Sequence, residues 1–140
     1  QLAASNPLPQ KGTLFVSVKD SDKAKILPVI RSFSKQGFKI LATSGTAQFL
    51  IDGGVKTKII NKVSQGSPHC VDALLEDKID IVINTTETRK SINDSFGIRR
   101  TALIKNIPYS LTVSGARASI NSIKRLKAED ITVSPITDFH

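Results

Sequence analysis

Short apolar runs rich in β-branched residues alternate along the chain with segments whose apolar residues recur at helical spacing. The short runs have the composition of strands buried on both faces, and they cover residues 13–18, 38–42, 55–60, 79–83 and 110–113. The helical segments cover residues 27–36, 46–51, 71–76, part of 92–105 and 116–127. This alternation predicts an α/β domain with a five-stranded, doubly wound (Rossmann-like) parallel sheet, right-handed crossovers and helices on both faces.

Prolines mark two of the expected boundaries. Because proline lacks an N–H group, Pro28 is expected in the first turn of the first helix, which Gly37 should end. Residues 1–11 carry Pro7 and Pro9 and show no period that would bury a face, so we interpret them as a linker. The expected organisation is therefore a linker over 1–11 and one domain over 12–140. A first residue other than Met suggests a piece of a longer protein.

The charge of the chain and its small number of cysteines and histidines limit the classes of function that it can have. The chain has 20 Lys and Arg against 12 Asp and Glu, a formal charge of +8, which predicts an anionic partner. A nucleotide, a phosphate metabolite, a nucleic acid and an acidic protein face all remain open. One cysteine excludes an intramolecular disulfide, and two histidines are too few for a Cys/His zinc site. No apolar run reaches the roughly 18 residues of a membrane span, so we expect a cytoplasmic chain without metal or membrane contact.

Polar and cationic side chains follow four of the predicted strands. In an open parallel sheet, ligands bind where the carboxyl ends of the strands and the following helix starts converge. The candidate residues are Ser17 and Lys23 after the first strand, Thr43 and Thr46 after the second, Asn61 and Lys62 after the third, and Asn84, Thr86, Arg89 and Lys90 after the fourth.

The turn Thr43-Ser44-Gly45-Thr46 is the strongest candidate for a phosphate cradle. Glycine lets the backbone approach a ligand, and free N–H groups at a helix start point at an anion. The alternative is an ordinary helix cap, as Ser and Thr commonly provide. Asn84 could equally tie down a strand end, and each cation alone could be surface charge. Their convergence on one edge favours a phosphate site.

Other chemistry has weaker support. The chain has neither a Gly-x-Gly-x-x-Gly nor a Gly-Lys-Ser/Thr motif. His69 and Cys70 are adjacent in sequence and would rarely face each other, which argues against a nucleophile pair. One Tyr and six Phe leave no aromatic platform for RNA, so nucleic acid is not the expected partner.

Several short motifs occur in a distinctive order from about Gly12 to the last strand. They are Ser17-Val18 with Asp22-Lys23, Gln36-Gly37-Phe38, Ala42 to Ala47, Asn61-Lys62-Val63, Gly66 to His69, Ile83 to Thr86 and Ile98-Arg99-Arg100. Together they resemble the carboxyl-terminal regulatory domain of the carbamoyl-phosphate synthase large subunit, which is a methylglyoxal-synthase-like domain.

The resemblance implies an allosteric, non-catalytic domain. In bacterial members uridine monophosphate inhibits and inosine monophosphate is a weaker effector, and the family's effector contacts fall on the ten candidate residues above. The resemblance implies no cofactor in this domain. It assigns ATP, Mg²⁺ or Mn²⁺ and K⁺ to the parent ligase, which makes carbamoyl phosphate from bicarbonate, ATP and glutamine for arginine and pyrimidine synthesis. The implied partners are the other domains of the large subunit and the glutaminase small subunit.

Two departures from the family pattern bear on ligands. Glu87-Thr88 replaces a Ser-Gly pair, and a carboxylate near a phosphate is unfavourable unless it points away, so Glu87 is expected to weaken or reshape the site. Some members bind ornithine with a Tyr-Asp-Thr stretch at the fifth strand. Here Tyr109-Ser110-Leu111 lacks the carboxylate, which puts ornithine in doubt.

Two alternatives belong to other classes of protein. A lyase on the same fold makes methylglyoxal from dihydroxyacetone phosphate, which needs a carboxylate base and a histidine. The Gly-Asp-Gln-Gln stretch of those lyases reads Ser67 to Cys70 here, and no histidine occurs between Ile79 and Arg100. Asp20 and Asp72 are the remaining candidate bases, and Asp72 fits better as a helix cap. The other alternative is a nucleic-acid-binding module, which a steep salt dependence would reveal.

Overall fold

The fold is a single five-stranded parallel sheet with helices on both faces. The computed structural model describes the backbone of residues 8–85 and 89–138, and the side chains of these residues apart from 64, 89–95 and 130–138. The strands are β1 (Thr13–Ser17), β2 (Lys39–Ala42), β3 (Lys58–Ile59), β4 (Ile81–Asn84) and β5 (Tyr109–Ser110). They lie in the order β3-β2-β1-β4-β5, and every neighbouring pair is parallel. The doubly wound sheet predicted from the sequence is confirmed.

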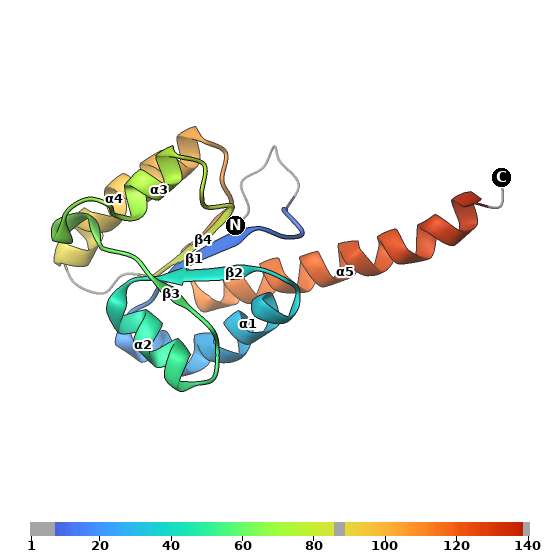
Figure 1. Cartoon of the computed structure of the whole chain (residues 1–140), viewed down its shortest axis with the longest axis horizontal. Helices are drawn as coiled ribbons and strands as arrows, with labels where there is room; N and C mark the ends of the chain where they lie inside the picture. The colour runs from blue at the N-terminus through green and yellow to red at the C-terminus, as the bar shows by residue number, and fades with distance from the viewer. Residues whose placement is uncertain (1–7, 86–88, 139–140) are drawn as a thin grey trace.

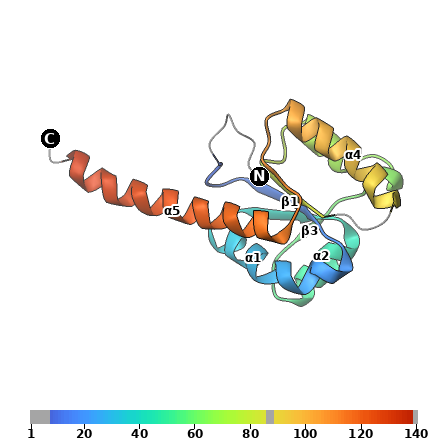
Figure 2. The ribbon, with the colours of Figure 1, turned by 180° about the vertical axis from the view of Figure 1, so that it is seen from behind.

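The helices form two layers that enclose the sheet (Figures 1 and 2). One layer holds α1 (Lys23–Lys35), α2 (Ser44–Asp52) and α5 (Val113–Asp138), and the other holds α3 (Cys70–Leu75) and α4 (Arg89–Ile104). Short 3₁₀ turns, η1 (Asp20–Asp22) and η2 (Val63–Gln65), lie in the loops after β1 and β3. Within residues 8–85 and 89–138, no helix combines the length and the apolar character of a membrane span.

Each face of the sheet carries its own apolar core, because successive strand residues point to opposite faces. Leu14 and Val16 of β1 belong to the core beneath α1, α2 and α5, and Phe15 between them belongs to the core beneath α3 and α4. Leu8 also packs into the first of these cores, although it lies in the predicted linker. Residues 1–7 of that linker lie outside the described residues, and its boundary stays a prediction.

The first helix begins four residues before its predicted start. Pro28 therefore lies in the second turn of α1 and not in the first, which corrects the sequence-based expectation. A proline there leaves the carbonyl of Ala24 without its helical donor. Ala24 and Pro28 are both exposed, so water can satisfy that carbonyl.

Two strands and the last helix also differ from their predicted bounds. The β3 strand pairs over two residues only, and Val55, predicted to belong to it, packs into the core beneath α1, α2 and α5. At the other edge, β5 ends at Ser110 and α5 begins at Val113, where the hydroxyl of Thr112 accepts a hydrogen bond of 3.0 Å from the N–H of Gly115. Such a cap starts the helix earlier than the apolar spacing indicates.

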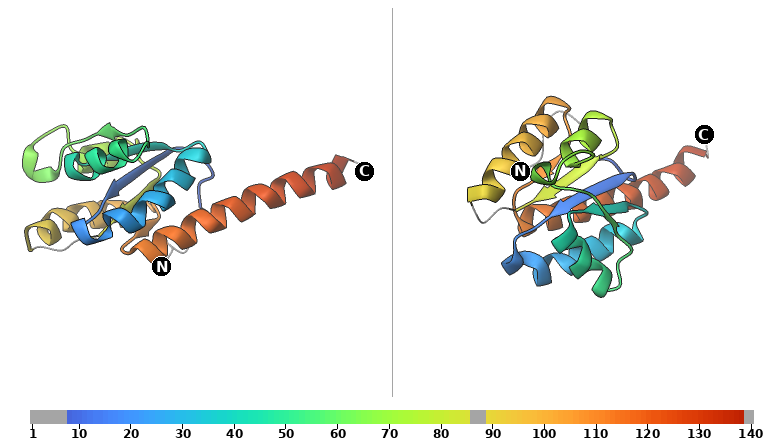
Figure 3. Two further views of the ribbon diagram at one scale, coloured as in Figure 1. Left: turned by 90° about the horizontal axis from the view of Figure 1, so that it is seen from below. Right: turned by 60° about the vertical axis from the view of Figure 1, so that its left-hand side comes forward.

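Lysines of α5 hold this helix against α1. The ammonium of Lys127 donates to the carbonyl of Gln36 over 2.6 Å, and that of Lys124 donates to the hydroxyl of Ser32 over 3.4 Å. Cations are favourable at the carbonyl end of a helix. Figure 3 shows that α5 continues from there beyond the rest of the domain.

Candidate functional site

Two threonine hydroxyls tie together the loops after β1 and β2 at the carboxyl edge of the sheet. Thr43 donates from Oγ1 to Oγ of Ser17 over 3.2 Å. Thr46 accepts at Oγ1 from the N–H of Val18, also over 3.2 Å. Both threonines are buried. The structure thus brings Ser17, Thr43 and Thr46 together, because β1 and β2 are neighbouring parallel strands that end side by side.

The N terminus of α2 is open at this edge. Thr43 occupies the N-cap position, but its hydroxyl is directed to Ser17, and none of the described side chains caps the first turn. The N–H groups of Ser44 and Gly45 lie in that turn, where a helix has no internal acceptors. Both residues are exposed. The positive end of the α2 dipole is therefore accessible to an anion.

Lys23 lies directly beside this helix start. A Cβ atom built on Gly45 would be 3.6 Å from Nζ of Lys23. The same ammonium lies 2.7 Å from Oδ1 of Asp20, whose side chain is 89% exposed. The hydrogen bond and charge of Lys23 lower the pKa of Asp20, and the charge of Lys62 lowers it further. Lys62, in the loop after β3, is thus within electrostatic reach of the same position.

The two asparagines of the candidate set both donate hydrogen bonds to other groups of the protein. Asn61 donates from Nδ2 to the carbonyl of Gly66 over 3.3 Å, which shapes its own loop. Asn84 is buried and donates from Nδ2 to Oη of Tyr109 over 2.8 Å. This contact links the end of β4 to β5, the strand-end role left open by the sequence. Burial raises the pKa of Tyr109, and the hydrogen bond from Asn84 opposes part of that rise.

The remaining predicted residues follow β4. Thr86 and Glu87 lie outside the described residues. Arg89 and Lys90 form the start of α4, and their side chains are not among those described. Whether these residues contact a ligand stays a prediction.

Thr85 is a buried residue at the carboxyl edge that the candidate set omits. Its hydroxyl accepts from the N–H of Lys19 over 2.9 Å, and its own N–H donates to the carbonyl of Ser17 over 3.0 Å. Thr85 therefore fixes the path of the loop after β1. Its place directly after a fully buried strand, next to Asn84, is the sequence signal that could have identified it.

Asp72, one of the two candidate lyase bases, takes part in the cap that starts α3. Asp72 accepts from the N–H of His69 over 3.0 Å, and Nδ1 of His69 accepts from the N–H of Asp72 over 3.3 Å. The hydrogen bond from His69, followed by one from Ser67, lowers the pKa of Asp72, which makes this carboxylate a weaker base. Cys70 is fully buried at the start of the helix. The capping role expected for Asp72 is confirmed.

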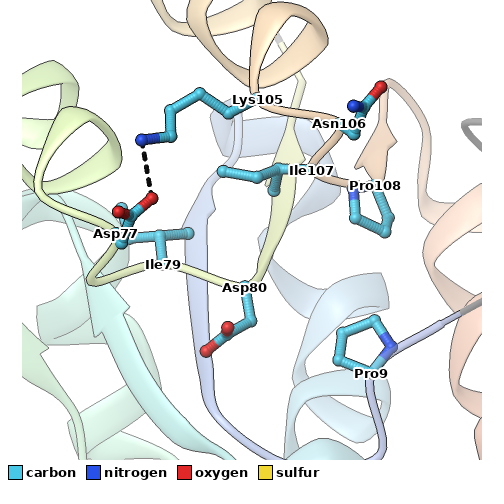
Figure 4. A pocket seen from close by; sticks show the side chains of 8 residues that line it. All are labelled: Pro9, Asp77, Ile79, Asp80, Lys105, Asn106, Ile107 and Pro108. Carbon is cyan, nitrogen blue, oxygen red and sulfur yellow. Dashed lines mark ion pairs between the residues drawn. The ribbon is translucent and has the colours of Figure 1, made fainter. Parts of the chain in front are cut away.

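A groove of about 270 Å³ lies at the opposite, amino edge of the sheet (Figure 4). Its acidic side chains have structural partners. Asp77 pairs with Lys105 at 2.6 Å, and Oδ2 of Asp80 accepts from the N–H of Thr13 over 2.8 Å. This groove is therefore part of the scaffold, and the carboxyl edge remains the candidate site.

A second groove, of about 290 Å³, lies between the loops after β1 and β5, and its lining includes Asp22, the residue before Lys23. Its lining includes the cations Lys19, Lys25 and Arg117 and one carboxylate, Asp22. The excess of positive charge extends the cationic character of the carboxyl edge. The fold and this edge together define the class of the molecule: an α/β domain whose described carboxyl edge carries an excess of cations.

The comparisons with known proteins identify the family. The family model of the MGS-like domain matches residues 25–111, and the chain belongs to this family. A solved structure with the same fold is methylglyoxal synthase from Elizabethkingia anophelis, with a TM-score of 0.61 and 18% identity over 81% of this chain and 79% of that one.

The more similar curated relatives are larger proteins. The chain is 46% identical over 139 residues to the carbamoyl phosphate synthase large chain of Rhizobium meliloti, which covers 99% of this chain and 12% of that protein. It is 41% identical over 141 residues to the "Carbamoyl phosphate synthase large chain, C-terminal section" of Methanopyrus kandleri, covering 100% of this chain and 26% of that protein. These matches confirm the resemblance predicted from the sequence. The chain spans only about an eighth of the large chains it matches.

Proposed function

We propose that this chain is the allosteric domain of a carbamoyl-phosphate synthase large chain and binds a nucleoside monophosphate at the carboxyl edge of its sheet. Similarity to such large chains over 99% of its length supports the first part. The observation that carries the second part is the open N terminus of α2 beside the ammonium of Lys23.

The open turn offers the groups that a phosphate needs. The N–H groups of Ser44 and Gly45 donate to phosphate oxygens, and the ammonium of Lys23 supplies charge from the adjacent helix. Lys62 adds a second cation from the loop after β3. The hydroxyl of Thr43 turns from Ser17 to the ligand, while Asn84 and Thr86 are assigned to the sugar and base.

Regulation requires an attached enzyme. An effector changes activity only if it binds two states of the protein with different affinity. We assign those states to the ligase portion of the large chain, which makes carbamoyl phosphate with the glutaminase small subunit in the cytoplasm. The domain itself is proposed to be non-catalytic, and bound nucleotide is expected to change the apparent ATP affinity of the complete enzyme.

Ornithine fits this chain poorly. The groove beside Leu111 carries Lys19, Lys25 and Arg117, and its carboxylate, Asp22, is outnumbered by these cations. A cationic amino acid would be repelled there. This charge balance supports an anionic effector in preference to ornithine.

The test is calorimetric titration of the chain with uridine and inosine monophosphates. We expect heat of binding for at least one nucleotide, and Lys62→Ala and Lys23→Ala should each weaken it about ten-fold by removing a charge-assisted contact. Lys35→Ala is the matched control, because Lys35 ends α1 at the other side of the domain. The proposal fails if neither nucleotide binds at millimolar concentration, or if all three variants behave alike. Formation of methylglyoxal from dihydroxyacetone phosphate would instead establish the lyase.

A further inference from the structure

One face of α4 exposes large apolar side chains to solvent. Phe96 is 68% exposed and Leu103 is 72% exposed. Arg99 and Arg100, between them on the same helix, are exposed as well. Positions 96, 99, 100 and 103 share one face at helical spacing. The opposite face carries Ile98 and Ala102, which are buried against the sheet. We call Phe96, Arg99, Arg100 and Leu103 the outer face of α4.

Further apolar side chains extend this surface toward α3. Ile104 is 69% exposed at the end of α4, and Leu75 is 59% exposed at the end of α3. Lys105 joins these two helix ends, since its ammonium donates to the carbonyl of Leu75 over 3.3 Å. Figure 2 shows α4 on the outside of the domain, in the layer opposite α1, α2 and α5. Exposed apolar patches of this kind mark interaction sites.

We propose that the outer face of α4 docks on an apolar surface bearing carboxylates in the remainder of the same large chain. This inference rests on the proposed function. On the proposed function the occupant follows from length, because the match covers 12% of a related large chain and the rest of that protein lies outside the matched region. It also follows from charge, because Arg99 and Arg100 between two apolar side chains call for carboxylates on the opposing surface. Aromatic and arginine residues are the types enriched in protein interfaces.

The position of α4 links this face to the candidate ligand site. The helix begins at Arg89, shortly after β4 ends at Asn84 on the carboxyl edge, and carries the outer face on its second half. Small sliding movements of whole packed helices are one way in which domains switch between states. A ligand that shifts the start of α4 therefore shifts the docking face, which gives the nucleotide a physical route to the ligase.

The experiment measures thiol labelling in the complete large chain and in this chain alone. Leu103→Cys places a thiol on the outer face of α4, and Ile51→Cys places one on α2 as the control, where the native side chain is 43% exposed. Cys70 is buried and provides the internal reference. Alkylation by N-ethylmaleimide is followed by mass spectrometry of the individual peptides. We expect Cys at position 103 to react at least about ten-fold more slowly in the complete chain, and Cys at position 51 to react equally in both.

Charge reversal tests the carboxylates. In the complete chain, Arg99→Glu with Arg100→Glu should restore fast labelling at position 103, and Arg99→Lys with Arg100→Lys should not. Equal labelling at position 103 in both chains overturns the proposal. Protection in this chain alone that grows with its concentration also overturns it, because a second copy would then be the occupant. Nucleotide titration is separate, so docking without binding would remove the proposed effector role and leave the docking face established.

Discussion

The ammonium of Lys23 lies between the carboxylate of Asp20, 2.7 Å away, and the open start of α2 at Gly45. The ammonium of Lys23 thus pairs with one anion, Asp20, and also lies beside the exposed N–H groups at the start of α2, where a second anion would fit. Because the Asp20 side chain is 89% exposed, it can turn to solvent when a phosphate arrives. Asp20 holds the cation in place in this structure, and in the proposed complex it would compete with the phosphate for it.

The first prediction concerns this competition. Asp20→Asn removes a negative charge near the phosphate and should tighten nucleoside monophosphate binding about three-fold at low salt, with the gain lost near 1 M salt through screening. Calorimetry at two salt concentrations measures both effects. Asp52→Asn, at the far end of α2, changes the net charge equally and should leave affinity unchanged. Weaker binding by Asp20→Asn would show that the carboxylate contributes to the site.

The second prediction concerns the hydroxyl of Thr43. Thr43→Val keeps the shape of the buried side chain and removes the group that now donates to Ser17. A hydrogen bond to a charged phosphate contributes about 1.5–3 kcal/mol, so affinity should fall ten-fold or more. Thr43→Ser restores the hydroxyl and should recover most of the binding. Equal affinities of the Val and Ser variants would exclude a ligand contact by this hydroxyl.

The third prediction concerns the pair of Asn84 and Tyr109. Tyr109→Phe removes the acceptor of the buried Asn84 amide and should lower the free energy of unfolding by about 1 kcal/mol. Asn84→Leu and the double variant complete a cycle, in which the two losses should be less than additive. Urea denaturation measures all four proteins. Strict additivity would mean that this hydrogen bond adds nothing to stability.

The fourth prediction is that the stability of the fold depends on pH through Tyr109. Burial raises the pKa of Tyr109 above its usual 10.0 in the folded protein, while the unfolded chain titrates near that value. The contribution of the protonated phenol to the free energy of unfolding is complete below about pH 10. It is lost as the pH rises through the raised pKa, because the unfolded state releases its proton first. Tyr109 is the only tyrosine, and no Trp is present, so phenolate absorbance reports it directly. An apparent pKa at or below 10.0 in the folded chain would contradict the prediction.

The fifth prediction concerns Gly12, before β1. Its φ is +129°, and a Cβ atom there would overlap the Asp80 carboxylate that accepts from the N–H of Thr13. Gly12→Ala should therefore destabilise the fold by about 2–3 kcal/mol. Gly37→Ala is the control, because Gly37 also has positive φ but open space around it, so only backbone strain of about 1 kcal/mol applies. Equal losses in the two variants would mean that the overlap with Asp80 relaxes freely.

Much of the architecture could be predicted because its signals are local. Buried strands such as residues 81–83 appear as continuous apolar runs, and the segment from residue 27 repeats Leu27, Ile30 and Phe33 at helical spacing, of which Ile30 and Phe33 are buried. Boundaries were less predictable, because they depend on partners outside the local pattern. Thr112 starts α5 early by accepting from the N–H of Gly115, and Val55 packs into the core instead of pairing in β3.

The candidate site also has a part that could be predicted from the sequence and a part that could not. The rule that ligands bind at the carboxyl ends of parallel strands placed Ser17, Thr43 and Thr46 on one edge from order alone. The rule could not tell which side chains face a ligand. Asn84 is turned to Tyr109, 25 positions away, and Thr85 holds the loop after β1. Both contacts depend on which strands become neighbours.

By itself, the sequence determined the class of fold, the order of its elements, the family and the net positive charge, because periodicity, motif order and charge are properties of the chain as written. Only the tertiary structure decided that the hydroxyl of Thr43 donates to Ser17 and does not cap α2, and that Lys23 lies beside the first turn of this helix. These contacts join residues separated by about twenty positions or more. They arise only when the packing of the sheet and its helices fixes which loops meet.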